Sequence, residues 1–307
     1  MVAAVFSRRQ VAAGLAVLPL VPATVHAVPS RLDRVMVQGR PQDTGSLYKV
    51  RNILPALDKL GGLRRMRCRE PYAGTPGWNT YLGLARQGVT FCLTLSGREI
   101  AKTIADLKAF VIQAPGAIWA VEFPNEPDLN PVNYNGVHDS RLGFRTGNAP
   151  VLMSYIKDFT ASFKAESSLK TIPLIASNDF MQAEQAPFTT YGNAHIYPKP
   201  ATVVADRLTS FGEKIAVGRH THGVITEWGR TTGGGAKNVT SPPVSLEQQA
   251  ILLASDLAAA LDRPLIRAIS IYELFSWAGT SEMNNFGLFN ADLTPRPAVA
   301  AIRAVIG

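Results

Sequence analysis

Two glutamates stand where a buried strand of this sequence is expected to end. Glu126 follows the apolar run 118–123, within Phe-Pro-Asn-Glu-Pro-Asp, and Glu227 closes the run 223–227, within Thr-Glu-Trp-Gly. Two carboxyl groups about 5 to 5.5 Å apart can cleave a glycosidic bond with retention, one as proton donor and the other, ionised, as nucleophile. The pair could do this chemistry only if the fold brings the two side chains face to face.

The elements around the two glutamates predict such a fold. Short apolar runs alternate with segments of helical period, which indicates repeated strand-helix units and a parallel sheet. Eight strands fit an α/β protein with a single (β/α)8 TIM barrel better than an open doubly wound sheet, since the first turn lacks Gly-x-Gly-x-x-Gly. The expected strands are 34–38, 63–69, 89–95, 118–123, 172–177, 193–197, 223–227 and 266–272, and helices are expected at 47–59, 98–112, 151–167, 201–213, 245–261 and 297–305.

Strands 4 and 7 lie on opposite sides of an eight-stranded barrel, and active sites form at the carboxyl ends of the strands. Glu126 and Glu227 should therefore face each other, with their carboxyls about 5 to 6 Å apart. The long irregular loops 130–150 and 230–243 follow these strands and are typical of substrate-binding architecture. One further local signal, Ser245 with Gln248, predicts a capping box at the start of the helix 245–261.

With Asn125-Glu126 after strand 4 and Glu227 ending strand 7, the chain resembles clan A of the glycoside hydrolases over essentially all of residues 28–307. The run Glu-Phe-Pro-Asn-Glu-Pro-Asp looks most like family 39 and its exopolysaccharide-hydrolase relatives, while family 5 and several smaller families stay open. The resemblance implies a retaining enzyme with Glu126 as acid/base and Glu227 as nucleophile.

The resemblance also implies roles for Arg67 and Asn125. Arg67 would donate to the nucleophile, although Arg65 or Arg69 on the same strand face could do so instead. Asn125 would hydrogen-bond the sugar 2-hydroxyl, a contact that strengthens in the transition state. Alone, Arg67 would be read as an ordinary ion-pair arginine.

Four ring-bearing residues complete the expected substrate site. His195 and Tyr197 match the clan's His-x-Tyr at the end of strand 6, where the tyrosine bonds to the nucleophile. Trp277, after strand 8, matches the aromatic floor under the cleaved sugar, and Trp228, beside the nucleophile, is a further expected substrate contact. Taken singly, His195 and Trp277 would be core residues.

Three other acids, Glu70, Glu122 and Glu273, rival the pair, and Glu122 and Glu273 could be supporting or sugar-binding carboxylates. No metal or other cofactor is expected. His220 and His222 precede strand 7, at the opposite end of the barrel, and lack a carboxylate or Cys companion at ligand spacing. No zinc-protease, serine-hydrolase, Walker or dinucleotide motif occurs.

The first residues read as a leader. Ser7-Arg8-Arg9 precedes an apolar run to Val21, and a small-residue cleavage site ends at Ala27. The paired arginines resemble a twin-arginine signal, the alternative being an ordinary secretory leader. We therefore expect a signal peptide at 1–27, one catalytic domain at 28–307, and a periplasmic or secreted protein without stable membrane insertion.

The net charge of +8 falls to +6 once Arg8 and Arg9 leave with the leader. The Lys and Arg residues of the chain are scattered, and no nucleic-acid module is visible, so no nucleic-acid partner is expected. Cys68 and Cys92 are too few for a disulfide scaffold; two buried thiols or one bridge between neighbouring strands both remain open.

These features predict a monomeric retaining hydrolase that cuts a bacterial or plant polysaccharide or its oligosaccharides internally. The alternative is an inactive carbohydrate-binding envelope protein on the same barrel, because strand 1 ends Gln38-Gly39-Arg40, without the Asn-x-His found in many clan members.

Overall fold

The structure is a computed structural model that describes residues 29–141, 143, 147–177, 182–198, 204–233, 243–279 and 282–307. The expected leader, residues 1–27, lies outside the described residues, as does most of the loop 230–243. Among the described residues, no helix is long and apolar enough to cross a bilayer.

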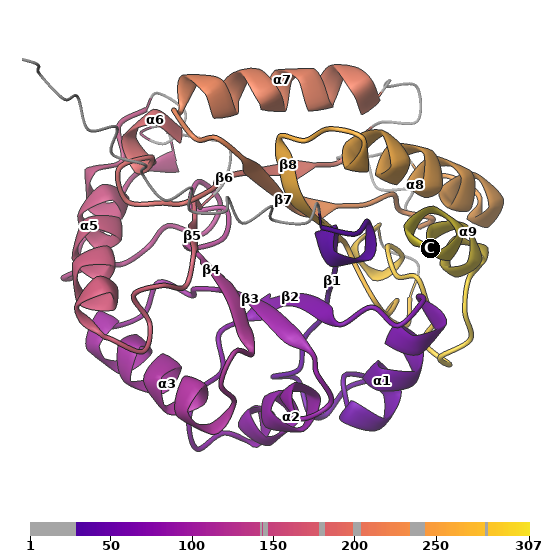
Figure 1. Ribbon diagram of the computed structural model, residues 1–307, viewed down its shortest axis with the longest axis horizontal. Helices are drawn as coiled ribbons and strands as arrows, with labels where there is room; N and C mark the ends of the chain where they lie inside the picture. Colours follow the sequence, from indigo (N-terminus) through magenta and orange to yellow (C-terminus); the bar gives the residue numbers. More distant parts are fainter. Residues whose placement is uncertain are drawn as a thin grey trace, which may run out of the picture.

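Eight parallel strands form one sheet, in the order β5-β4-β3-β2-β1-β8-β7-β6. An isolated bridge between Ile175 and Tyr191 joins its two edges, so the sheet is a nearly closed barrel, as predicted (Figure 1). Each strand lies within two residues of its expected limits, and β5 is shorter than expected by two residues at each end. The strands are β1 Val35–Gln38, β2 Arg65–Arg69, β3 Thr90–Thr94, β4 Ile118–Glu122, β5 Leu174–Ile175, β6 Gly192–Ile196, β7 Gly223–Trp228 and β8 Ile266–Ile271.

The helices form a ring around the sheet (Figure 1). Their apolar faces and the outward faces of the strands make the main core. The predicted capping box at Ser245 and Gln248 is present and opens α8. The helices are α1 Val50–Lys59, α2 Pro76–Ala85, α3 Ile100–Gln113, α5 Pro150–Ala165, α6 Gln182–Gln185, α7 Val204–Val217, α8 Leu246–Leu261 and α9 Pro297–Ile306, with short 3-10 turns η1 Leu32–Arg34 and η2 Glu282–Asn284.

A second, smaller cluster of buried side chains fills the inside of the barrel. Met36, Cys92, Ala120, Val224 and Ala268 belong to it, each from a different strand. Since successive side chains of a strand point to opposite faces, the residues two places further along these strands are aimed at the carboxyl end of the barrel interior.

The two cysteines occupy opposite faces of neighbouring strands. Arg67 pairs with Cys92 and Cys68 with Leu93 in the β2–β3 register, so Cys92 points into the barrel and Cys68 toward the helices. Both are free and buried, which decides between the two alternatives left open by the sequence.

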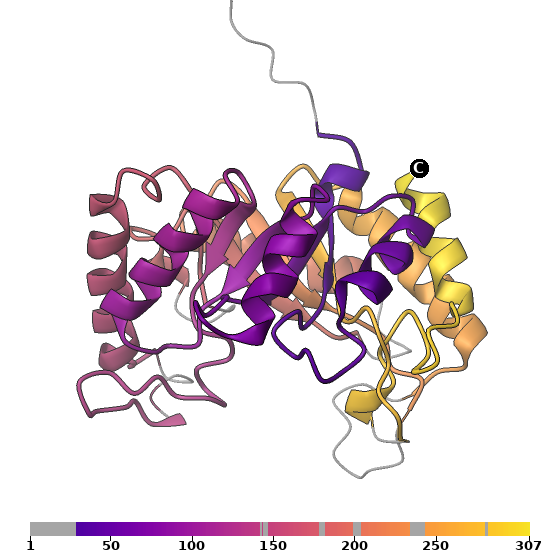
Figure 2. The same ribbon diagram turned by 90° about the horizontal axis from the view of Figure 1, so that it is seen from below.

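The two ends of the barrel differ. Seen from the side, the long loops that follow the strands gather at one end, whereas η1 and the end of α9 lie at the other (Figure 2). The loop-rich end is the carboxyl end of the strands, where both glutamates lie.

Candidate active site

A β-bulge in β7 aims Glu227 into the barrel. In the ladder with β6, Ala194 pairs with Ile225 and His195 with Glu227, so one residue of β7 is skipped. A bulge of this kind re-aims side chains. As a result both side chains point into the barrel mouth, where Thr226 donates to Glu122 and Glu227 accepts from Arg67.

Arg67 of β2 lies at the centre of this mouth. Its guanidinium donates through Nε and Nη2 to the two oxygens of Glu122, at 2.6 and 2.8 Å. The remaining donors reach Glu227 Oε1 at 2.6 Å, Asn125 Oδ1 at 2.6 Å and Gln38 Oε1 at 2.5 Å. Arg67 therefore links β1, β2, β4 and β7 through one buried cation.

Glu122, at the end of β4, is the counter-ion beneath Arg67. Thr94, Asn193 and Thr226 also donate to its carboxylate, at 3.0, 3.1 and 3.0 Å. Burial alone would raise the pKa of Glu122, but the charge and hydrogen bonds of Arg67, together with the nearby His195 ring, outweigh burial and lower its pKa to about 2. Glu122 therefore stays ionised and holds Arg67 in place.

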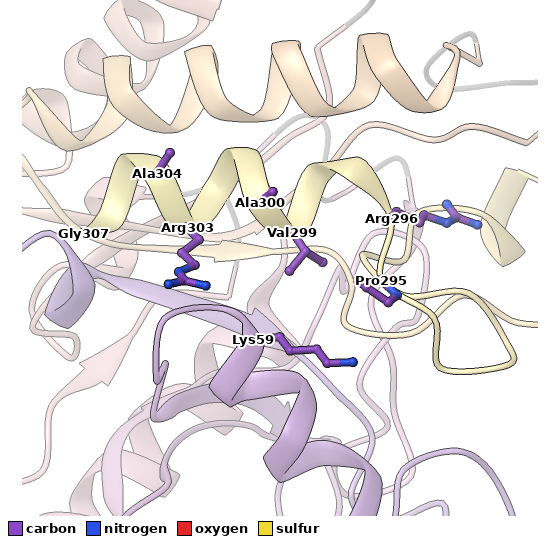
Figure 3. A pocket seen from close by; sticks show the side chains of 8 residues that line it. All are labelled: Lys59, Pro295, Arg296, Val299, Ala300, Arg303, Ala304 and Gly307. Atoms are coloured by element: carbon purple, nitrogen blue, oxygen red, sulfur yellow. The ribbon is translucent and has the colours of Figure 1, made fainter.

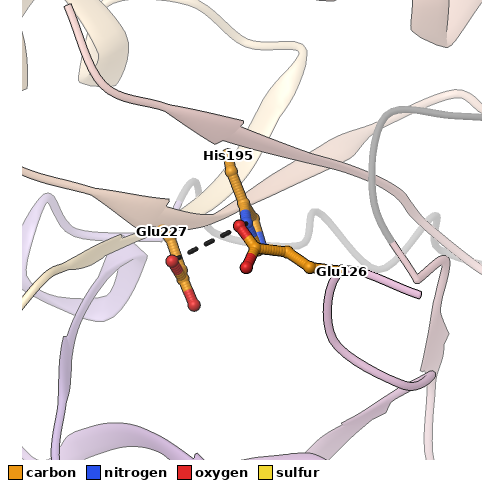
Figure 4. A group of neighbouring side chains, drawn as sticks. All are labelled: Glu126, His195 and Glu227. Atoms are coloured by element: carbon orange, nitrogen blue, oxygen red, sulfur yellow. Dashed lines mark hydrogen bonds and ion pairs between the residues drawn. The ribbon is translucent and has the colours of Figure 1, made fainter. Parts of the chain in front are cut away.

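Glu126 lies four residues further, in the turn that leaves β4. Its backbone has φ +44°, a left-handed conformation that is uncommon for a residue with a side chain. Its side chain is 31% exposed, and His195 Nδ1 lies 3.0 Å from its Oε1. Figure 4 shows Glu126, His195 and Glu227 converging on one point.

The two candidate carboxylates face each other as expected. One oxygen of Glu126 and one of Glu227 lie within 4.8 Å. His195 Nδ1 stands between them, 3.6 Å from Glu227 Oε2. Burial would lower the pKa of His195, but the negative charge of Glu227 and the neighbouring carboxylates of Glu122 and Glu126 raise it to about 10, so the ring is cationic.

Each oxygen of Glu227 has a strong donor. Arg67 binds Oε1, and the Tyr197 hydroxyl donates to Oε2 at 2.5 Å. Burial would raise the pKa of Glu227, yet the charges of His195 and Arg67 and the Tyr197 hydrogen bond lower it. Glu227 is therefore held as a carboxylate.

No family model and no curated protein sequence matches this chain. The fold is similar to that of solved glycoside hydrolases. A family 2 β-galacturonidase from Eisenbergiella tayi superimposes with TM-score 0.63 and 14% identity over 88% of this chain and 50% of that one. A family 39 glycoside hydrolase from Bacteroides cellulosilyticus gives 0.60 and 16%, over 90% and 64%. A family 17 β-1,3-glucanosyltransferase from Rhizomucor miehei gives 0.64 and 14%, over 89% and 98%.

The chain thus has the barrel fold of clan A enzymes, family 39 among them, as the sequence resemblance implied. It spans about half the length of the family 2 enzyme. At these identities the likeness concerns the fold.

Trp277, in the loop after β8, lies beside a second buried acid. Arg40 stacks over the Trp277 ring, with its guanidinium carbon 5.0 Å from the ring centroid, and lies 3.5 Å from Glu273 Oε2. Tyr48 also donates to Glu273, at 3.2 Å. Burial raises the pKa of Glu273 to about 7, although Arg40 and Tyr48 oppose this.

The expectation that Trp228 contacts substrate is wrong in this structure. Trp228 is 1% exposed and packs in the core between sheet and helices. The reason is the bulge in β7, because the extra inward residue turns the next side chain outward.

Among the described residues, neither of the other arginines of β2 nor the third rival acid makes a hydrogen bond or ion pair with Glu126 or Glu227. Arg65 stacks on Trp119, with its guanidinium carbon 4.6 Å from the ring centroid; Arg69 is exposed at the end of β2. Glu70 accepts from Ser96. Arg67 alone of the three arginines reaches Glu227.

Glu126, His195 and Glu227 are close enough for one cation to touch all three. The donors already present argue against a metal there, because Arg67, Tyr197 and cationic His195 supply positive charge and hydrogen bonds to the same oxygens.

Two hollows differ in their relation to this site. The hollow at the barrel mouth, about 310 Å³, reaches from Glu227 and Asn125 across β1 and β2. A larger groove, about 630 Å³, lies outside the barrel between α1 and α9, lined by Lys59, Val299 and Arg303 among others (Figure 3). Neither candidate carboxylate lines that groove.

Sequence reasoning missed the residues that support the site. Gln38, Thr94 and Thr226 have ordinary polar side chains in the last residues of β1, β3 and β7, Asn193 lies near the start of β6, and Tyr48 lies in a loop before α1. A positional signal was available for the first three, since they lie on the inward face near the carboxyl ends of their strands.

Proposed function

We propose that this chain is a retaining glycoside hydrolase that cuts a bacterial or plant polysaccharide internally, with Glu227 as nucleophile and Glu126 as acid/base. The observation that carries the proposal is the pair of facing carboxylates, one oxygen of Glu126 lying within 4.8 Å of one oxygen of Glu227. Inverting enzymes need a wider gap of about 6.5 to 9.5 Å to admit a water molecule.

The surroundings of the two acids support these roles. A nucleophile must be ionised, and Arg67 and Tyr197 hold Glu227 in that state. Glu126 is the more exposed of the two, with 31% of its side chain accessible against 8% for Glu227. It can therefore reach the leaving-group oxygen and later the incoming water.

In the first step, a Glu227 oxygen attacks the anomeric carbon while Glu126 gives its proton to the departing sugar oxygen. In the second, Glu126 takes a proton from water, which attacks the glycosyl-enzyme ester and releases Glu227. The Oδ1 of Asn125 accepts from Arg67, which fixes the amide so that its NH2 group can donate to the 2-hydroxyl.

The roles are tested with aryl glycosides and a polysaccharide panel. Glu227→Gln should lose nearly all activity on every substrate, because no covalent intermediate can form. Glu126→Gln should keep turnover on aryl glycosides whose leaving group needs no proton, and azide should rescue it as a glycosyl azide of retained configuration.

Glu213→Gln, an exposed change on α7, serves as the control and should behave as wild type. Rescue of Glu227→Ala by azide with retained configuration, together with a dead Glu126→Gln, would reverse the assignment. Polysaccharide binding without turnover in the wild-type protein would instead assign the inactive carbohydrate-binding role.

A further inference from the structure

The hollow at the barrel mouth lies on one side of the scissile bond. Glu227 lines it and Glu126 does not. Because the nucleophile bonds to the donor sugar and the acid protonates the leaving group, a hollow that contains only the nucleophile receives the donor sugar. Its walls come from the loop after β1 and from β2, through residues such as Gln42 and Arg69.

Three arginines line this hollow, but they differ in how far their charge is neutralised. Arg67 is paired with both Glu122 and Glu227. Arg69 is exposed at the end of β2, on the same strand face as Arg67 and about 6.6 Å further along the strand. In the described part of the chain its side chain makes no hydrogen bond and no ion pair.

Arg40 is the third cation. Its side chain is 34% exposed, and its nearest acid is Glu273, 3.5 Å away and fully buried. Because burial raises the pKa of Glu273 to about 7, that carboxyl is an incomplete counter-ion near neutral pH. The acids that line the hollow itself are Asp43 and Glu227, and Asp43 makes no ion pair with Arg40 or Arg69 among the described residues.

We propose that the donor sugar of this enzyme carries a carboxylate, which Arg40 and Arg69 bind, so that the substrate is an acidic polysaccharide containing uronic acid. A guanidinium matches a carboxylate through two parallel hydrogen bonds, and both side chains line the same hollow as Arg67 and Glu227. The proposal rests on the proposed function for the orientation of the sugar, and the binding test below is independent of turnover.

The test uses the full chain and pairs of polymers that differ only in charge. Polygalacturonate, alginate and hyaluronan are each compared with the same polymer after reduction of its carboxyls to hydroxymethyl groups, which keeps its linkages. Binding is measured by retardation in native gels cast with each polymer, and cleavage by product release. For at least one native polymer, the polymer concentration that halves the mobility of the protein should be at least tenfold lower than for its reduced form.

Arg69→Gln and Arg40→Gln should each weaken that retardation about 10- to 100-fold, the range expected for a lost charge-assisted pair. Arg51→Gln removes the same charge from the exposed face of α1 and should leave it unchanged. Arg69→Lys should bind more strongly than Arg69→Gln but more weakly than wild type, because lysine restores the charge without the two parallel donors of the guanidinium.

Equal retardation by native and reduced polymers would overturn the proposal, as would no retardation by any of them or an equal loss in Arg51→Gln. Retardation by dextran sulfate but not by dextran or the uronate polymers would assign the hollow to a sulfate ester instead. Cleavage of neutral polymers alone would leave the proposed function standing while this inference fails. Binding that depends on the two arginines but is followed by no cleavage would support this inference while the proposed function fails.

Discussion

At the scale of single residues, Glu126 combines two properties. It is a candidate catalytic group, and its backbone has a positive φ although it carries a side chain. Such conformations cost about 1 to 3 kcal/mol and persist where the surrounding structure holds them. Here the strand β4 on one side and Pro127 on the other fix the turn.

This strain gives a prediction with an unusual sign. Glu126→Gly and Glu126→Ala both remove the carboxylate, and in most positions the glycine variant would be the less stable. Here Glu126→Gly should unfold at a higher denaturant concentration than Glu126→Ala. Its free energy of unfolding should be larger by about 1 kcal/mol, because glycine adopts positive φ freely. Urea unfolding of the two variants measures the difference, and the opposite order would show that the turn is unstrained.

His195 gives a second prediction, on the pH dependence of stability. Its pKa rises from 6.5 to about 10 on folding, so its charge stabilises the fold fully below about pH 6.5 and this stabilisation is lost as the pH rises through about 10. His195→Asn should therefore flatten the alkaline decline in the free energy of unfolding, measured by urea unfolding across that range. His222→Asn, at a half-buried position just before β7, should leave the decline intact.

Residue types located the two glutamates, and the resemblance supplied Arg67 and Tyr197 as partners of Glu227. Strict alternation along β7 would have put Trp228 inside the barrel and Glu227 outside. Only the bulge reverses this, and a bulge depends on the ladders with β6 and β8, which no local pattern records.

At the scale of elements, the sequence did not predict α2 or the four-residue α6, and α2 is the longer of the two. It begins Pro76-Gly77 and contains Gly83, and two glycines make a poor helix by propensity. Burial of Trp78 and Tyr81 overrides that weakness, and a proline in the first turn was the one local signal present. Long periodic helices were predicted within a few residues because their apolar faces are read directly from sequence.

The glycine in the first turn of α2 has a packing reason. A Cβ on Gly77 would lie 2.7 Å from the Cα of Gln42, and Gln42 lines the hollow at the barrel mouth. Gly77→Ala should therefore push the loop after β1 and raise KM several-fold, with a loss of stability of about 1 to 3 kcal/mol. Enzyme kinetics and thermal unfolding check both effects.

Gly45→Ala is the matched control for this change. It lies in the same loop after β1, and an added Cβ there meets nothing within 4 Å. It should leave KM and stability close to wild type, whereas an equal effect of both substitutions would remove the packing explanation.

At the scale of the whole molecule, the order of eight strands was predictable because each strand-helix unit repeats the same pattern. Export remains a prediction, since the leader lies outside the described residues. Arg8→Lys with Arg9→Lys should retain the protein inside the cell while leaving the specific activity of residues 28–307 unchanged, as measured by cell fractionation and assay. Export at the wild-type level would rule out the twin-arginine interpretation and leave a general secretory route.

The two cysteines on opposite faces of the sheet can report, through their rates of chemical labelling, how the fold opens. Burial raises the pKa of Cys68 to about 12 and that of Cys92 well above its ordinary value, so neither thiol is a ready nucleophile at neutral pH. Cys68 faces the helices and also borders the hollow at the barrel mouth, whereas Cys92 is fully buried inside the barrel. Alkylation of Cys92 therefore requires the strands to separate, while alkylation of Cys68 requires only a local opening beside the sheet. The two labelling rates report separately on these two motions, without any engineered tag.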